Sequence, residues 1–266
     1  MEISNRPLAV VTGASSGIGL ELAKLFAADG HDVIVAAEDA DIHTTAEGLA
    51  ASGVDAEAVQ ADLATSQGVA TLVRRIEGSG RPVDAIALNA GVGAGGAFAT
   101  DTALEDELRV IDLNVRSTVQ LAKPVVRDMV RRDAGRILFT SSIGATMPGT
   151  FHAVYNASKS FVQSFALALR NELKDTGVSV TTLMPGPTET EFFERADLVD
   201  TRIGASDKDD AGDVARAGYE ALMAGDERAV ASSLSTKAQA RGSRVLPDAA
   251  KAEAHRKMAE PGSGKQ

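Results

Sequence analysis

The chain has 266 residues, of which 44% are hydrophobic and 24% are charged, and this composition fits one large α/β domain better than two small ones. The formal net charge of −10 argues against a nucleic-acid partner. The sequence has no cysteine, and its four histidines lack ligand spacing, so we expect no disulfide, no thiol nucleophile and no metal site.

The opening segment and the apolar runs bear on where the protein works. The first residues, MEISNRPLAVVTG, lead directly into a short Val-rich strand and lack the basic-then-apolar pattern of a signal peptide. No apolar run approaches the length of a membrane span. We therefore expect a cytoplasmic protein that does not interact with a membrane.

Strand and helix signals alternate along the chain. Short apolar runs predict strands over 7–13, 31–37, 55–64, 83–91, 135–142 and 178–186. Apolar residues at helical spacing predict helices over 17–30, 103–132 and 158–177, and another helical stretch ends near residue 53. Near-continuous apolar strands that alternate with helices indicate a parallel sheet covered on both faces. The expected fold class is α/β: a single domain built on a Rossmann-type doubly wound parallel sheet in three layers, with a C-terminal helical tail.

The C-terminal part differs from the rest in charge. We expect the domain to cover residues 1–230, and residues 231–266 to form a helical extension whose last residues, EPGSGKQ, are loosely ordered. Basic residues outnumber acids toward this end. One interpretation is a solvated helical tail, and the other is a tail that docks on an acidic surface of a sister subunit.

A glycine-rich turn follows the first strand. The run TGASSGIG places Gly13, Gly17 and Gly19 at a strand-to-helix junction. Glycines there let the backbone approach a pyrophosphate, and the N-terminus of the helix offers free N–H groups and the positive end of its dipole. The spacing is G-x-x-x-G-x-G and not the standard G-x-G-x-x-G. Nucleotide binding is favoured over a merely tight turn.

Six ordered motifs carry a resemblance to a known family. They are TGASSGIG at 12–19, NAG at 89–91, the Asn of LNV at 114, SS at 141–142, YNASK at 155–159 and PGPTET at 185–190. In this order and spacing, the chain resembles the short-chain dehydrogenase/reductase family over about residues 6–230. The doubled Asn usual before AG is Leu88-Asn89 here, and the second Asn is retained. The resemblance implies a dinucleotide-binding and catalytic domain that oxidises or reduces a small molecule.

Tyr155 and Lys159 are the centre of the expected catalytic group. An ordinary Tyr has a pKa near 10, too high for efficient acid–base catalysis at neutral pH, and a lysine one helical turn away favours the phenolate. Tyr155 is then the general acid in reduction and the general base in oxidation, and Lys159 lowers its pKa. The resemblance assigns Ser142 to orient the substrate carbonyl, with Ser141 as the structural alternative. It assigns Asn114 to a proton relay to Lys159, whereas the plainer account of Asn114 is a helix kink or a surface amide.

The remaining expected site residues bind cofactor or substrate. The resemblance implies cofactor contacts from Gly13, Ser15, Ser16, Gly17, Ile18, Gly19, Glu38, Asp62, Leu63, Asn89, Ala90, Gly91, Tyr155, Lys159, Pro185, Gly186, Thr188 and Thr190. For the substrate we expect contacts from Ser142, Tyr155, His152 and Phe192, although a histidine at such a position is more often simply exposed.

The end of the second strand bears on the choice of cofactor. A free 2′-hydroxyl suits a carboxylate, whereas a 2′-phosphate requires a basic residue. The sequence places Glu38 and Asp39 here, and Ser15 and Ser16 in the glycine turn, with no basic residue among them. Ala37 stands where NAD-dependent relatives commonly carry their Asp. We expect NAD(H) to be preferred, with NADP(H) as the other option.

The expected function is the interconversion of a secondary alcohol and a ketone by an NAD(P)(H)-dependent oxidoreductase. The alternative is a catalytically silent sensor or scaffold on the same fold. Intact Asn114, Ser142, Tyr155 and Lys159 count against that alternative. A partly apolar segment after Thr190 is expected to form a lid over a small-molecule substrate. By resemblance, the helices around Asn114 and after Tyr155 form the interfaces of a homotetramer, with a dimer as the fallback.

Overall fold

The protein was analysed as a computed structural model, which describes residues 5–230 and 246–265. Seven parallel strands form one sheet in the order β3-β2-β1-β4-β5-β6-β7. The strands are β1 (Leu8–Thr12), β2 (Asp32–Ala37), β3 (Ala56–Gln60), β4 (Ala85–Leu88), β5 (Gly135–Thr140), β6 (Val178–Met184) and β7 (Arg228–Val230). The expected parallel, doubly wound sheet is confirmed. The sequence analysis did not predict β7.

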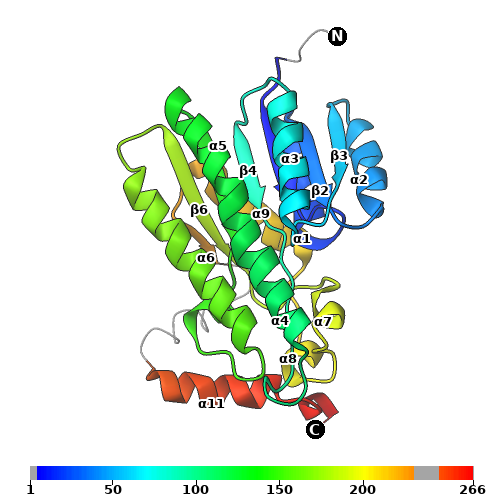
Figure 1. The fold of residues 1–266 in the computed structure, drawn as a ribbon, viewed down its shortest axis with the longest axis vertical. Helices are drawn as coiled ribbons and strands as arrows, with labels where there is room; N and C mark the ends of the chain where they lie inside the picture. Colours follow the sequence, from blue (N-terminus) through cyan, green and yellow to red (C-terminus); the bar gives the residue numbers. More distant parts are fainter. Residues whose placement is uncertain (1–4, 231–245, 266) are drawn as a thin grey trace.

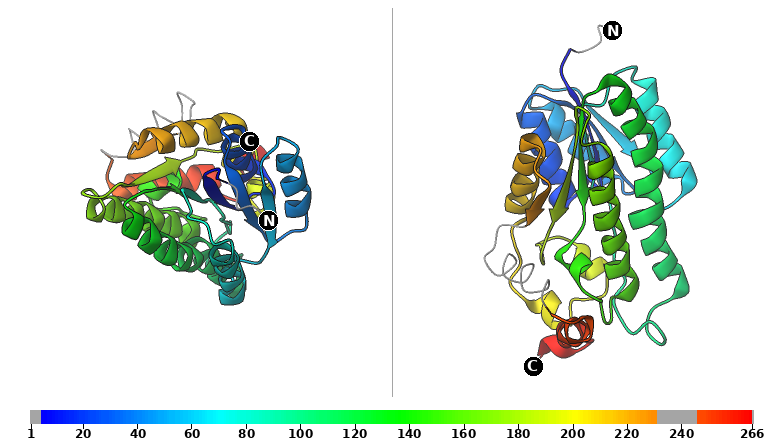
Figure 2. Two further views of the ribbon diagram at one scale, coloured as in Figure 1. Left: turned by 90° about the horizontal axis from the view of Figure 1, so that it is seen from above. Right: turned by 90° about the vertical axis from the view of Figure 1, so that its left-hand side faces the viewer.

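Helices cover both faces of the sheet (Figures 1 and 2). On one face lie α1 (Gly17–Ala28), α2 (Asp41–Ala50) and α9 (Ala211–Ala224). On the other lie α3 (Ser66–Gly78), α4 (Leu104–Ile111), α5 (Thr118–Arg132) and α6 (Ala153–Glu172). A π-helical segment, Asp112–Ser117, joins α4 to α5. Short helices α7 (Phe192–Arg195) and α8 (Arg202–Ala205) follow β6.

The central strands supply apolar residues to two hydrophobic cores, one on each face of the sheet, and are therefore buried on both sides. In β1, Leu8 and Val10 pack into the core with α3, α5 and α6, whereas Ala9 and Val11 pack into the core with α1, α2 and α9. Successive side chains of a strand point to opposite faces, so a continuous apolar run suits a sheet covered on both sides. This explains why apolar runs alone predicted six of the strands.

The C-terminal helix α11 (Asp248–Ala259) lies across the end of the molecule where α7 and α8 also gather (Figure 1). Thr150 Oγ1 donates a hydrogen bond to the carbonyl of Ala252 (2.9 Å), and His255 and Ala259 are buried. The expectation of a solvated tail is therefore wrong for α11, because its apolar face packs on the protein's own chain. Residues 231–245 and 266 of the extension lie outside the described residues, and the boundary at residue 230 stays a prediction.

The last residues are also held in place, contrary to the expectation of a loose end. A 3₁₀ turn covers Ser263–Lys265. Gly262 N donates to the Asp200 carboxylate (2.9 Å), and Gly264 N donates to the Asp200 carbonyl (2.8 Å). These bonds to the segment between α7 and α8 fix the tail to the part of the chain that we expected to form a lid.

Candidate active site

A cavity of about 240 Å³ opens at the carboxyl edge of the sheet. The sheet order reverses between β1 and β4, and doubly wound sheets bind their ligands in the crevice at such a point. Of the residues that the sequence analysis proposed for the site, Gly19 and Asn114 do not line the cavity, and all the others do. The predicted residues that line the cavity are up to 177 positions apart in the sequence, from Gly13 to Thr190.

The glycine turn has the backbone geometry that a phosphate cradle requires. Gly13 and Gly17 have positive φ angles of 64° and 53°, which side chains rarely adopt. A Cβ on Gly13 would lie 2.9 Å from the Ala90 Cα, and one on Gly17 would lie 2.7 Å from Thr190 Cγ2. Ser16 caps α1 without a side-chain hydrogen bond to the described backbone, which leaves the first N–H groups of the helix open to a ligand. These features fit a dinucleotide pyrophosphate.

Gly19 and Asn89 hold the turn in place. A Cβ on Gly19 would meet the Gly13 carbonyl oxygen at 1.9 Å, so Gly19 serves close packing behind the cavity. The Asn89 side chain donates to the carbonyl oxygens of Thr12 (3.2 Å) and Gly13 (3.3 Å) and accepts from Thr140 Oγ1 (3.0 Å). Asn89 therefore ties the ends of β1, β4 and β5 together in addition to lining the cavity.

The far end of the cleft contains an arginine that the sequence analysis missed. Arg109 of α4 forms an ion pair with Glu38 after β2 and hydrogen bonds to both oxygens of Asp62 after β3 (3.1 and 3.3 Å). Burial lowers the pKa of Arg109, but the bonds and charges of Asp62 and Glu38 outweigh it and raise that pKa. Asp39 accepts a hydrogen bond from Ser15 of the glycine turn (2.8 Å). The glycine turn and the acidic pair after β2 themselves contain no basic residue, and the tertiary fold brings Arg109 to this end from α4.

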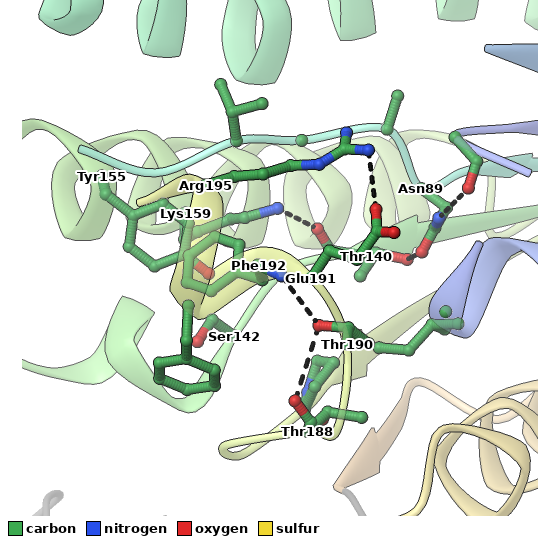
Figure 3. Close-up of a pocket in the computed structure, with 18 of the residues that line it drawn as sticks. Asn89, Thr140, Ser142, Tyr155, Lys159, Thr188, Thr190, Glu191, Phe192 and Arg195 are labelled. Atoms are coloured by element: carbon green, nitrogen blue, oxygen red, sulfur yellow. Dashed lines mark hydrogen bonds and ion pairs between the residues drawn. The ribbon is translucent and has the colours of Figure 1, made fainter. Parts of the chain in front are cut away.

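Ser142 and Tyr155 meet at the other end of the cavity (Figure 3). Burial raises the pKa of Tyr155 to about 12, and a hydrogen bond with the Ser142 side chain lowers it in part. The Ser142 oxygen also accepts from Gly144 N (3.0 Å), where it caps a short 3₁₀ turn, Ile143–Thr146. Ser141 also lines the cavity, but its hydroxyl donates to the carbonyl of Lys159 (3.0 Å). Of the two serines, only Ser142 contacts the tyrosine.

Lys159 lies beside Tyr155 but bonds elsewhere. Its Nζ donates to the Thr140 carbonyl (2.9 Å) and lies 5.8 Å from the centroid of the Tyr155 ring. Burial lowers the pKa of Lys159 to about 8. The expected lowering of the Tyr155 pKa by Lys159 is not seen here, because desolvation of the phenol dominates and Ser142 provides the opposing contribution.

Asn114 occupies the π-helical segment, a feature that often marks functional sites. Its side chain accepts from Val92 N (2.9 Å) and donates to the Val92 carbonyl and to Ser158 Oγ (both 2.9 Å). A Cβ on Gly91 would lie 3.1 Å from Asn114 Oδ1 and 3.1 Å from Lys159 Nζ. The Asn114 oxygen and the Lys159 amine therefore converge on one point beside the cavity. Because Asn114 is only 1% exposed, it is not a surface amide.

His152 and Phe192 pack directly on Tyr155. The His152 ring is stacked on the Tyr155 ring, with centroids 4.4 Å apart, and Phe192 lies 5.0 Å from Tyr155 on another side. His152 is only 4% exposed, so the usual expectation of an exposed histidine does not hold here. Burial lowers the pKa of His152 to about 3, and the nearby His255 contributes in the same direction.

The segment after β6 closes the remaining side of the cavity. Thr188 Oγ1 donates to the Gly186 carbonyl (2.9 Å), and Thr190 Oγ1 accepts from Phe192 N (3.3 Å), so the two threonines shape the turn into α7 (Figure 3). Arg195 donates to Glu191 (2.7 Å) one helical turn away. The lid expected after Thr190 is thus a folded segment that packs against Gly93 and Gly95.

Several lining residues were missed by the sequence analysis, among them Met147 after β5, and His255 and Met258 of the C-terminal tail. Leu198 and Ile203 also line the cavity, and they belong to the segment after Thr190 whose apolar content was noted from the sequence. No local pattern pointed to His255 and Met258, because a helix 100 residues after Tyr155 reaches the site only through the tertiary fold.

A doubly wound parallel sheet with a phosphate-type glycine turn, facing a serine–tyrosine pair across one cavity, defines a dinucleotide-dependent oxidoreductase. The family model described as short chain dehydrogenase matches residues 7–198. The chain belongs to this family of short-chain dehydrogenases, as its motifs suggested.

Three relatives illustrate the range of the family. The chain is 37% identical over 201 residues to a Streptomyces virginiae protein named as a ketoacyl reductase of the monensin polyketide synthase, covering 73% of this chain and 76% of the relative. A Sphingobium yanoikuyae short-chain dehydrogenase solved with NADPH has a TM-score of 0.78 at 30% identity, with 84% and 87% covered. A Burkholderia phymatum relative solved with NAD has a TM-score of 0.77 at 26% identity, with 86% and 90% covered.

These structures support a nicotinamide dinucleotide as cofactor and leave the choice between NAD and NADP open. Within residues 5–230 and 246–265, no helix is both long and apolar enough to cross a bilayer.

Proposed function

We propose that the protein is an oxidoreductase that interconverts a secondary alcohol and a ketone, with NAD(H) as its preferred cofactor and Tyr155 as the acid–base group. The observation that carries the proposal is the direct contact of Ser142 with Tyr155 inside a cavity that continues to the glycine turn. This arrangement places a proton donor and a second hydroxyl side by side, as reduction of a carbonyl requires.

The residues present fit a bound dinucleotide. The N-terminus of α1 and the backbone from Gly13 to Gly17 would hold the pyrophosphate, Glu38 and Asp62 the adenosine, and Lys159 and Thr188 the nicotinamide half. A bound nicotinamide would supply or accept the hydride. The chain's own residues then handle the proton and the position of the substrate.

In reduction, Tyr155 donates its phenolic proton to the substrate oxygen while Ser142 donates a hydrogen bond to the same oxygen. The raised pKa of Tyr155, about 12, keeps the phenol protonated at neutral pH and so suits this direction. In oxidation, Tyr155 has to accept the proton, and this step becomes easier as the pH rises.

Lys159 and Asn114 restore the proton that Tyr155 gives up. A water molecule at the point beside Gly91, where the Asn114 oxygen and the Lys159 amine converge, would link the two groups. With a pKa of about 8, Lys159 is mostly protonated at neutral pH and still able to release a proton.

The charge of the adenosine end supports NAD(H). Glu38, Asp39 and Asp62 bring three carboxylates there, and Arg109 is the one arginine of the described residues that pairs with them, so this cluster is net negative. A 2′-phosphate would carry further negative charge into this cluster, whereas a free 2′-hydroxyl can donate to Glu38.

We further propose that the protein works as a homotetramer, or as a dimer, in the cytoplasm. Leu104, Leu108 and Ile111 of α4 and Phe161 of α6 are between 41% and 64% exposed, which is unusual for large apolar side chains on neighbouring helices. Burying them between subunits would remove this surface from water.

The experiment that tests the function has two parts. Nucleotide binding is followed by fluorescence on titration with NADH and NADPH, and turnover is then measured with ketones and NADH and with secondary alcohols and NAD at alkaline pH. Tighter NADH binding with turnover supports the proposal. Tighter NADPH binding contradicts the proposed preference for NAD(H). Binding without turnover of any substrate favours a silent dinucleotide sensor, and binding of neither nucleotide contradicts the whole proposal.

A further inference from the structure

The substrate side of the cavity contains a buried polar atom that the proposed reaction does not use. The Nε2 atom of His152 has no hydrogen-bond partner among the described residues, although its side chain is almost fully buried. A buried polar group without a partner costs free energy, and such groups in native proteins commonly mark a place that something else fills. His152 lines the same cavity as Ser142 and Tyr155.

A second histidine, from the C-terminal helix α11, lies close to His152. His255 of α11 lies 6.4 Å from His152, measured between ring centroids, and lines the same cavity. Its Nδ1 contacts the Thr150 carbonyl at 2.9 Å. Because a carbonyl can only accept, Nδ1 carries the proton, and in a neutral imidazole the opposite nitrogen, Nε2, is then an acceptor.

Several apolar side chains line the same cavity as the two histidines: Met147, Phe192, Ile203 and Met258. A few polar groups among apolar ones are what orients a ligand in a site of this kind, and the two imidazoles can serve as such groups. Burial lowers the pKa of both His152 and His255, so each is neutral at physiological pH.

We propose that His152 and His255 form a substrate subsite that hydrogen-bonds a second, uncharged oxygen of the substrate, close to the reacting carbon. The inference rests on the proposed function, since it takes Tyr155 as the group that meets the reacting oxygen. The substrate class is a ketone or secondary alcohol with an apolar body and a hydroxyl one or two carbons away from the carbon that reacts.

The position of His152 sets the distance between the two oxygens. Its ring stacks directly on the ring of Tyr155, at 4.4 Å, so a substrate oxygen bound by Tyr155 and one bound by His152 belong to the same short segment of the molecule. A hydroxyl suits the pair better than any other group, because it can donate to one imidazole and accept from the other.

The charges in the cavity argue against an anionic group at this subsite. Two positively charged side chains line the cavity, and each is already bonded. Lys159 donates to Thr140, and Arg195 pairs with Glu191. A carboxylate would meet two neutral imidazoles and no free cation among the described lining residues, so its desolvation would not be compensated.

Phe192 covers the subsite in this conformation. A Cβ built on Gly93 would lie 2.7 Å from the Phe192 ring and 3.0 Å from His152 Nε2, so the two side chains meet above Gly93. Phe192 is the first residue of α7, a helix of only four residues. The ring of Phe192 has to withdraw from His152 when a substrate oxygen takes its place.

The test compares two ketones that differ only in the second oxygen. They are 4-hydroxy-4-phenylbutan-2-one and 4-phenylbutan-2-one, reduced with the nucleotide that the protein binds more tightly. We expect kcat/KM to be at least about tenfold higher for the hydroxyketone in the wild-type protein, since a site built to bond a hydroxyl discriminates against an analogue that lacks it. In His152→Phe and in His255→Leu, we expect this ratio to fall toward one.

The ratio separates binding of the hydroxyl from a merely structural role. A variant that only disturbs packing slows both ketones alike and leaves the ratio unchanged, and this result would overturn the inference. His43→Phe is the matched control, because His43 is exposed on α2, and it should keep the wild-type ratio.

Ketone dissociation constants, read from the fluorescence of the bound reduced nucleotide in Tyr155→Phe, which lacks the proton donor, provide the same ratio with turnover suppressed. A protein that prefers neither ketone in either measurement contradicts the subsite while leaving the proposed function intact. Failure to bind any nucleotide would instead contradict the proposed function.

Discussion

Arg109 of α4 forms an ion pair with Glu38 at the end of β2, across the cleft that the dinucleotide enters. The pair places a positive charge beside the carboxylate on which the proposed preference for NAD(H) rests. Since Arg109 also bonds Asp62, one side chain balances two of the three acids at this end. We therefore expect the choice between NAD and NADP to depend on a residue of α4 as well as on the sequence after β2.

Arg109→Gln should raise the preference for NADH over NADPH by about three- to tenfold, because it leaves three carboxylates uncompensated near the 2′ position. Glu38→Gln should lower the preference. The measurement is the dissociation constant of each nucleotide from fluorescence titration. Arg116→Gln is the matched control, since Arg116 is paired with Asp112 farther along the same helical stretch. If Arg109→Gln weakens the binding of NADH and of NADPH equally, the role of Arg109 is purely structural.

Tyr155→Phe should lower kcat/KM for ketone reduction by about 10²- to 10⁴-fold, the usual contribution of a general acid. The substitution removes only the phenolic oxygen and keeps the ring that packs on His152 and Phe192. The dissociation constant of NADH should therefore stay within about threefold of wild type. Activity that survives this change would mean that another group supplies the proton.

Ser142→Ala and Ser141→Ala form a matched pair at adjacent positions. Ser141→Ala removes one hydrogen bond, from Ser141 to the Lys159 carbonyl, and should lower the free energy of unfolding by about 1 kcal/mol. Ser142→Ala removes two, from Gly144 N and with Tyr155, and should lower it by about 1 to 2 kcal/mol. Only Ser142 contacts Tyr155, and only Ser142→Ala should also reduce kcat, by about a hundredfold. Denaturant unfolding and steady-state kinetics measure the two effects. Equal loss of kcat in both variants would contradict the assignment.

The buried His152 should make the protein less stable in mild acid. Its pKa falls from about 6.5 in the unfolded chain to about 3 in the folded protein, so the unfolded state binds the extra proton first. This contribution is fully present above pH 6.5 and is lost as the pH falls toward 3, and the part lost between pH 7 and pH 5 amounts to about 2 kcal/mol. Denaturant unfolding at pH 7 and pH 5 measures it. His152→Phe should show a smaller difference between the two pH values, and an unchanged difference would rule out this cause.

The exposed apolar face of α4 should decide the oligomeric state. The double variant Leu104→Lys, Leu108→Lys introduces two charges on this face and should shift the protein toward the monomer in sedimentation experiments. Val199→Lys, at a 57% exposed position between α7 and α8, is the control and should not dissociate the oligomer. A wild-type protein that already sediments as a monomer would contradict the proposed tetramer and dimer alike.

Much of the fold and of the cofactor cleft could be predicted because their signals are local. Six strands lie in short, largely apolar runs, and the glycine turn follows one of them directly. The seventh strand, Arg228–Val230, has three residues and begins with a charged one, so no periodic pattern marks it. Its place in the sheet comes from pairing with β6.

The sequence by itself determined the parallel sheet, the phosphate-type turn and the identities of Ser142, Tyr155 and Lys159, because each depends on residue type and on spacing within one element or one turn. Only the tertiary structure decided the environment of these groups. Burial of Tyr155, on which His152 and Phe192 pack, removes water from the phenol and raises its pKa. Packing of α11 brings His255 to His152. Ion pairing across the sheet likewise brings Arg109 to Glu38. Desolvation and charge pairing depend on every neighbour in space, and these neighbours are far apart in the chain.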